Sequence, residues 1–259
     1  MYKKKSLGQH FLTSAHYVRL IADAAEIKKG EVVLEIGPGE GVLTRELLAR
    51  GAKVVAIEKD ARLIPVLQET FAEEIKNKTL VIHEADALDY DISKSFSKRQ
   101  EYKVVANIPY YITGALLKKF LSGETQPATL VFLIQKEVAE RIVARDKKES
   151  ILSLSVKAYG TPKIMAKVPR GAFNPPPTVD SAILLVREVS HKNFKNQKHE
   201  DRFFELVRAG FAQKRKLLAS NLKKLLGEKH SNILKNVGIS EKVRAEDVSL
   251  AQWVSLSKN

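Results

Sequence analysis

The residues best suited to chemistry begin with a glycine-rich stretch, Leu34–Gly41, whose sequence is Leu-Glu-Ile-Gly-Pro-Gly-Glu-Gly. Glycines at a turn from strand to helix let the backbone approach a ligand at the N-terminal end of the helix. The spacing is Gly-x-Gly-x-Gly, whereas the dinucleotide-binding fingerprint requires Gly-x-Gly-x-x-Gly, and Val42 occupies the sixth place. This pattern disfavours NAD, and the lack of Gly-Lys-Ser/Thr excludes a P-loop. A tight turn without a ligand is the alternative for this stretch alone.

Three acidic residues lie at the ends of successive predicted strands. Glu35 suits a ligand with an amino-acid moiety better than a pyrophosphate. Glu58 comes 21 residues after Gly37, where a carboxylate can accept hydrogen bonds from both ribose hydroxyls. Asp86 follows the third strand and could accept from an adenine amine. Each acid alone could be a helix cap or a solvated turn. In register, the three resemble the cofactor site of the Rossmann-like class I S-adenosylmethionine (AdoMet) methyltransferases.

The tetrapeptide Asn107-Ile108-Pro109-Tyr110 carries the most specific chemistry and resembles the (Asp/Asn/Ser)-Pro-Pro-Tyr loop of enzymes that methylate exocyclic amines. Such an amine is a poor nucleophile because its lone pair is delocalised into the ring. Acceptors on its N–H groups, here the Asn107 oxygen and the Ile108 carbonyl, would localise that pair. Pro109 fixes the loop, and Tyr110 offers a π-face to an unstacked base. Catalysis would then depend on positioning and electrostatics. The alternative is a strand-end turn with a packed tyrosine.

The elements that must position these residues alternate between strand and helix along the first half of the chain. Strands at this spacing imply right-handed crossovers and a parallel sheet covered on both faces. Residues 151–158 and 182–189 are further elements expected near the sheet edge. We expect strands at 31–36, 53–58, 80–83, 102–107 and 128–134, and helices at 41–50, 60–75 with Asp60 as N-cap, 113–121 and 136–144.

The last part of the chain has a different pattern. The polar stretch 190–200 is typical of a linker. Beyond it, apolar residues recur with the helical period of about 3.6 residues. We therefore predict two domains, an α/β domain at 1–189 and a small helical domain at 190–259.

Composition narrows the class of protein further. The 259 residues carry a formal charge of +14, and residues 181–259 hold 16 Lys+Arg against 8 Asp+Glu. Such a charge favours a polyanionic partner, with nucleic acid ahead of an anionic membrane surface. The absence of cysteine excludes disulfides, cysteine-ligated metals and thiol nucleophiles, and the six histidines show no metal-ligand spacing. No apolar run approaches about 18 residues, so we expect no membrane span and a cytoplasmic protein.

Taken together, the chain resembles the KsgA/Dim1 family of ribosomal RNA small-subunit adenine N6,N6-dimethyltransferases. Leu7–Leu12, Glu35–Gly41, Asn107–Tyr110 and Phe173–Ser181 carry this resemblance, and Phe211–Lys216 is similar to the family's basic signature. The resemblance implies transfer of four methyl groups from AdoMet to N6 of two adjacent adenosines. These lie in the hairpin loop near the 3′ end of small-subunit (16S) rRNA, within an immature 30S particle. The protein would act as a monomer, without a metal.

Two other functions stay open. One is the related large-subunit rRNA methyltransferase that confers macrolide resistance, against which the segment Val179–Ala182 and the basic signature argue. The other is a non-catalytic RNA-binding factor for ribosome assembly on a methyltransferase scaffold, which the intact glycine loop and Asn107 motif make improbable.

The resemblance also assigns roles to individual residues. Phe173 would sandwich the flipped adenine opposite Tyr110, unless it is simply a core residue. Five basic residues would contact RNA phosphates, unless they form a solvated helix face: Lys214, Arg215, Lys216, Lys223 and Lys224. The expected cofactor residues are His10 and Leu12 beside the methionine moiety, Glu35, Gly37 and Gly39 in the glycine loop, Glu58 on the ribose, Asp86 on the adenine, and Asn107 on both cofactor and target.

Overall fold

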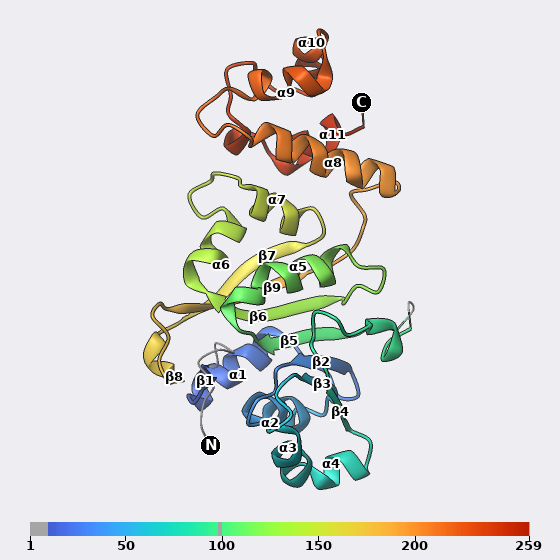
Figure 1. Ribbon diagram of the computed structural model, residues 1–259, viewed down its shortest axis with the longest axis vertical. Coiled ribbons are helices and arrows are strands. Elements are labelled where there is room, and N and C mark those ends of the chain that lie inside the picture. The colour runs from blue at the N-terminus through green and yellow to red at the C-terminus, as the bar shows by residue number, and fades with distance from the viewer. Residues whose placement is uncertain (1–9, 98–99, 259) are drawn as a thin grey trace. The chain divides into compact units, whose positions relative to one another are not determined.

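The computed structural model describes residues 10–97 and 100–258 (Figure 1). Its contacts divide the chain into two compact units. The first unit runs to Ala139 and resumes at Thr161–Val189; the second comprises Glu140–Gly160 and the chain from Ser190 onward. The predicted division at 189/190 coincides with one of these transitions. Residues 140–160 belong to the second unit, although the sequence predicts them to be part of the first domain.

A seven-stranded sheet forms the first unit, in the order β4-β3-β2-β5-β6-β9-β7. The strands from β4 to β6 pair in parallel, and β9 is antiparallel to both of its neighbours. This mixed sheet with helices confirms the α/β, Rossmann-like class. The bounds are Val32–Ile36 (β2), Lys53–Glu58 (β3), Leu80–Glu84 (β4), Lys103–Asn107 (β5), Thr129–Gln135 (β6), Thr161–Val168 (β7) and Ser181–Arg187 (β9).

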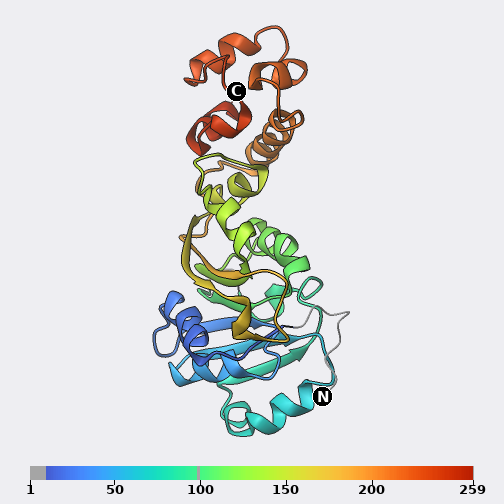
Figure 2. The same cartoon turned by 90° about the vertical axis from the view of Figure 1, so that its left-hand side faces the viewer.

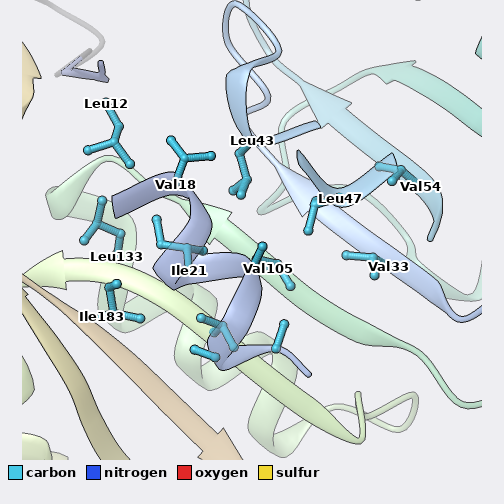
Figure 3. Close-up of a cluster of buried hydrophobic side chains, with 14 of the residues drawn as sticks. Leu12, Val18, Ile21, Val33, Leu43, Leu47, Val54, Val105, Leu133 and Ile183 are labelled. Carbon is cyan, nitrogen blue, oxygen red and sulfur yellow. The ribbon is translucent and has the colours of Figure 1, made fainter. Parts of the chain in front are cut away.

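Successive side chains of the buried strands point to opposite faces of the sheet, and each face packs against a layer of helices. Val131 and Leu133 of β6 belong to the core cluster that includes residues of α1 (Ala15–Ala24) and α2 (Val42–Ala49). Figure 3 draws 14 residues of this cluster, among them Leu133. Phe132 points to the opposite face, where its ring meets Phe120 of α5 (Thr113–Ser122) at 6.4 Å. Figure 2 accordingly shows α1 (blue) and α5 (green) on different sides of the strands. A nearly continuous apolar sequence such as that of β6 is what a strand buried on both faces requires.

One strand of the seven-stranded sheet, β7, escaped the sequence analysis. β7 contains Pro162 and alternates exposed and half-buried residues, and it lies at the edge of the sheet, where a proline costs no ladder hydrogen bond. β9, expected near the edge, lies inside it. A separate two-stranded sheet pairs β1 (Phe11–Leu12) with β8 (Phe173–Asn174), and no local pattern signals so long-range a pairing.

The predicted helix over 60–75 is wrong in detail. The chain forms α3 (Ile64–Thr70) and α4 (Ala72–Lys76), separated at Phe71. Asp60 is not the N-cap: its carboxylate accepts from the backbone N–H of Arg62 and pairs with the Arg62 guanidinium. At this break between the two helices, the Phe71 ring packs against Gly41 at the start of α2.

The second unit is helical, with α7 (Ile151–Lys157), α8 (Gln197–Gly210), α9 (Leu218–Leu226), α10 (His230–Asn236) and α11 (Leu250–Leu256). Residues 151–158 are therefore part of this unit and not of the sheet edge. The predicted linker is also wrong in its extent, because Asn196 caps α8 and Phe194 is buried. The Phe194 ring contacts Tyr159 and Phe203, so this segment is packed rather than free.

Candidate active site

A cavity of about 200 Å³ lies at the carboxyl ends of four neighbouring strands, β4, β3, β2 and β5. Open α/β sheets bind ligands at this edge. The residues that line it include all of those assigned by sequence to the cofactor and the target: His10, Leu12, Glu35, Gly37, Gly39, Glu58, Asp86, Asn107, Ile108, Pro109, Tyr110 and Phe173. The structure therefore brings together residues that are up to 163 positions apart in the chain.

The glycine loop joins β2 to α2 and is shaped by positive φ angles. Gly39 has φ +61°, and a Cβ there would lie 3.0 Å from the Phe11 ring. Gly41 has φ +80°, and a Cβ would lie 2.4 Å from the ring of Phe71. Larger residues would be strained and would also clash at both positions. These two positions therefore require glycine, and they allow the Phe11 and Phe71 rings to pack closely against the loop.

Glu35 is a buried carboxyl with one oxygen unpaired. Its side chain is 1% exposed, and Oε2 accepts a hydrogen bond of 2.7 Å from the Thr44 hydroxyl. Oε1 is buried and has no hydrogen-bond partner among the described residues. Burial raises the pKa of Glu35 to about 8, and the nearby carboxylate of Glu58 acts in the same direction. A buried carboxyl that lacks a cation needs either a proton or a positively charged ligand.

Glu58 ends β3 and is fixed by the backbone. Oε2 accepts from Gly39 N–H at 3.1 Å, and Oε1 accepts from Asp60 N–H at 2.8 Å. Burial raises the pKa of this carboxyl, and the two backbone hydrogen bonds oppose that shift. Each oxygen keeps a second lone pair, so the carboxylate can still receive two hydroxyl donors.

Asp86 is held from two sides. Lys59 donates to Oδ2 at 2.6 Å, and the backbone N–H of Leu88 donates to Oδ1 at 2.9 Å. These hydrogen bonds lower the pKa of Asp86, so its side chain is ionised at neutral pH. Lys59 has no signal in the sequence that marks it as a partner of Asp86, because the two residues follow different strands.

Asn107 ends β5 and touches the N-terminal segment. Its Nδ2 donates to the carbonyl of His10 at 3.3 Å. The His10 Nδ1 is in turn 2.9 Å from the carbonyl of Pro175. The β1–β8 pairing next to these contacts fixes His10 and Leu12 at the cavity.

Tyr110 begins a 3₁₀ turn, Tyr110–Ile112, directly after Pro109. Its hydroxyl and that of Ser181, at the start of β9, are 2.6 Å apart. The Tyr110 ring stacks on the imidazole of His10 with centroids 6.1 Å apart and planes 24° apart. Ser181 belongs to the Phe173–Ser181 motif, but its contact with Tyr110 could not be read from spacing.

Phe173 is a core residue that also reaches the cavity. Its side chain is 4% exposed and belongs to the main core cluster, and it also lines the cavity. In this structure the aromatic ring stacked on Tyr110 is that of His10, and Phe173 forms part of the cavity wall. Its contact with a flipped base stays a prediction.

The five basic residues assigned to RNA lie apart from this cavity along the chain, in the second unit. Lys214–Lys216 belong to the turn between α8 and α9 rather than to a helix, and all three are exposed. Lys223 and Lys224 are exposed in the last turn of α9. Leu7, Gly8 and Gln9 of the N-terminal motif lie outside the described residues.

Residues 10–97 and 100–258 lack two further kinds of feature. Within them no group of three His, Cys, Asp or Glu side chains could hold a metal ion. No helix there is long and apolar enough to cross a bilayer.

Comparisons with known proteins agree with this geometry. The model of a family described as ribosomal RNA adenine dimethylase matches residues 1–259. Ribosomal RNA small subunit methyltransferase A of Dehalococcoides mccartyi is 41% identical over 256 residues, which cover 98% of this chain and 87% of that protein. The protein of the same name from Fusobacterium nucleatum is 38% identical, with 98% and 96% covered.

Two solved structures share the fold over nearly the whole chain. A dimethyladenosine transferase from Plasmodium falciparum matches with a TM-score of 0.81 and 29% identity, over 95% of this chain and 96% of that one. The 23S rRNA methyltransferase ErmE matches with a TM-score of 0.78 and 27% identity, over 96% and 98%. Because the family model spans the full sequence and relatives keep about 40% identity over almost all of it, the chain belongs to the ribosomal RNA adenine dimethylase family.

Proposed function

We propose that this protein transfers methyl groups from AdoMet to N6 of two adjacent adenosines in the 3′-terminal hairpin loop of small-subunit (16S) rRNA, within an immature 30S particle. The observation that carries the proposal is the position of the Asn107–Tyr110 loop. It opens into the same cavity as Glu35, Glu58 and Asp86, at the end of the adjacent strand. The relatives named above as small subunit methyltransferases support this choice of substrate.

The residues of the cavity suit AdoMet. The unpaired Oε1 of Glu35 is a partner for the cofactor's ammonium group. Glu58 is poised for the ribose hydroxyls, and Asp86 for the adenine amine. Gly37 and Gly39, both with positive φ, place their backbone in the cavity wall. When bound, AdoMet supplies an electrophilic methyl group on a sulfonium, which is already a good leaving group.

The Asn107 loop would activate the adenine amine. Since Nδ2 of Asn107 donates to His10, its Oδ1 is the atom that can accept from N6–H. The carbonyl of Ile108, whose side chain is buried in the core, offers a second acceptor on a rigid backbone. Two such acceptors would localise the nitrogen lone pair in line with the methyl group. The reaction as proposed requires neither a thiol nor a metal.

The exposed lysines and arginine of the second unit would hold the rRNA. Solvent-exposed cationic side chains in a turn are suited to contact RNA phosphates. Such contacts contribute affinity that does not depend on the nucleotide sequence. We propose that Lys214–Lys216, Lys223 and Lys224 fulfil this role, and that the protein acts as a monomer.

Methylation of large-subunit rRNA is the second candidate, because the ErmE structure is nearly as similar as the dimethyladenosine transferase. The segment Val179–Ala182 favours the small subunit. In it, the hydroxyl of Ser181 meets that of Tyr110, and Asp180 accepts from the backbone N–H of Arg170, so the segment supports the Asn107–Tyr110 loop from behind. Relatives named for the small subunit are also closer in sequence.

Substrate choice decides between the two. Labelled AdoMet should mark 30S particles that lack the modification, and mass spectrometry should place the methyl groups on two adjacent adenosines near the 3′ end. Naked large-subunit rRNA should remain unlabelled in the same assay. Labelling of the large-subunit rRNA alone would refute the proposal.

A further inference from the structure

Tyr111 is an aromatic residue whose environment is unusual for its type. Its side chain is 65% exposed, more than any other large apolar side chain of the described residues. It nevertheless lines the same cavity as Asn107. A residue that is both largely exposed and part of the cavity wall lies at its mouth.

The two consecutive tyrosines differ in how they are held. The Tyr110 hydroxyl meets Ser181, and its ring stacks on His10, so this residue is tied into the wall. Tyr111 sits in the middle of the 3₁₀ turn that leads into α5, where Ile112 N–H donates to the carbonyl of Pro109. The backbone of Tyr111 is therefore rigid while its ring faces solvent.

The charge around Tyr111 suits an RNA strand. Lys59, 58% exposed, lines the cavity as well. Its ammonium pairs with Asp86 at 2.6 Å, and Lys59 and Tyr111 line the same cavity. A cation and an exposed π-face in the wall of one cavity form the combination that binds single-stranded nucleic acid.

We propose that Tyr111 is a stacking platform for the nucleobase that neighbours the adenosine being methylated. The inference rests on the proposed function. An adenine that enters the cavity must leave its stack, and this exposes a face of the adjacent base. With two adjacent adenosines as targets, the one outside the cavity would meet its mouth. An aromatic ring there would replace the lost stacking and hold the strand in register.

The test separates the ring from the hydroxyl and RNA from cofactor. Steady-state kinetics would use 30S particles that lack the modification, at saturating AdoMet, for wild type, Tyr111→Ala, Tyr111→Phe and Val81→Ala. Val81 is an exposed apolar residue on β4 outside the cavity lining and serves as the control. Calorimetry would give the Kd of AdoMet for each variant.

We expect Tyr111→Ala to raise KM for the particle about fivefold or more, as loss of one base–aromatic stack requires. Tyr111→Phe and Val81→Ala should stay within about twofold of wild type, and the Kd of AdoMet should be unchanged throughout. An unchanged KM in Tyr111→Ala, an equal rise in Tyr111→Phe, or a parallel loss of AdoMet affinity would each overturn the inference. Wild-type labelling in the same assay tests the proposed function separately, because its absence would refute that function without reference to Tyr111.

Discussion

The cavity of the first unit and the basic turn of the second (Lys214–Lys216) present charge in opposite ways. In the cavity, Glu35 and Glu58 are buried and Asp86 is half-buried, and each carboxyl has defined donors: Thr44 for Glu35, backbone N–H groups for Glu58, and Lys59 for Asp86. In the basic turn, Lys214–Lys216 are exposed. Burial makes position and protonation state matter at the first site, whereas solvent screening leaves mainly the number of charges at the second.

This difference predicts that single substitutions should be severe in the cavity and mild in the basic turn. A preorganised acceptor or donor at a reacting atom contributes far more than one exposed cation near a phosphate. A mild effect of Asn107→Ala, or a single basic-turn variant that abolishes activity, would contradict this comparison.

The largest effect is expected for Asn107→Ala. Removal of the acceptor for N6–H should lower kcat by about 100-fold or more, in line with the loss of one oxyanion-type contact. AdoMet affinity should fall much less, because the acids that hold the rest of the cofactor are intact. Single-turnover methylation and calorimetry measure the two quantities.

Asn107→Asp is the matched control, since it keeps an oxygen acceptor at the same place and should retain more activity than the alanine variant. Near-wild-type turnover by Asn107→Ala would instead show that the Ile108 carbonyl suffices and that Asn107 is not catalytic.

The next largest effect is expected for Glu35, which should make both the stability of the protein and its affinity for AdoMet depend on pH. Because its pKa is raised from 4.5 to about 8, the folded apo-protein holds a proton there that the unfolded chain releases. The free energy of unfolding without AdoMet should therefore decrease as pH rises from about 5 to 8. If the cofactor's ammonium binds the carboxylate, AdoMet affinity should increase over pH 5.5–7.5, by up to about tenfold per pH unit. Above that range the ligand's own amino group loses its proton.

Glu35→Gln isolates this group from Glu58, whose pKa is also raised. The variant should show a flatter stability profile and an AdoMet affinity that varies little with pH. Calorimetry in buffers of different ionisation enthalpy should find about one proton fewer released per AdoMet than in wild type. Equal proton release by both proteins would rule out Glu35 as the linked group.

The sequence predicted the cavity well because its residues follow a rule of position. Strand ends of a parallel sheet meet at one edge, so Gly37, Glu58, Asp86 and Asn107 could be brought together from strand spacing alone. The contacts that orient these side chains could not be predicted from the sequence. Thr44, Lys59 and Ser181 each act across a gap in the sequence that only the tertiary fold closes.

The errors in the fold have the same origin. β7 was missed because an edge strand tolerates polar residues and Pro162, which weakens its periodic signal. The helix over 60–75 was overextended because local periodicity does not register that Phe71 must leave the helix to pack on Gly41. The segment around Phe194 looked like a linker because one buried aromatic ring among seven polar residues is not a pattern.

Asp86 sharpens the comparison with a smaller effect inside the cavity. Asp86→Ala removes the expected acceptor for the adenine amine and the cap on Leu88 N–H, and should weaken AdoMet binding by about tenfold. Lys59→Met, which leaves the carboxylate in place, should change the Kd by less than about threefold, because an exposed ion pair contributes little. Calorimetry compares the two variants directly, and equal losses would mean that the Lys59–Asp86 pair, rather than the carboxylate, supports the site.

The smallest effect per residue is expected in the basic turn. If Lys214, Arg215 and Lys216 contact phosphates, replacing all three by alanine should weaken rRNA binding at low salt and flatten the plot of log affinity against log salt. Each lost contact should reduce the slope by about 0.7–0.9, so the triple variant should lose roughly 2–3. The AdoMet Kd should not change, because the cavity residues are untouched. A triple variant with Lys163, Lys167 and Arg202 replaced removes equal charge from other elements and controls for net charge. If both triple variants lower the slope equally, the rRNA senses overall charge, and the basic turn has no special place in binding.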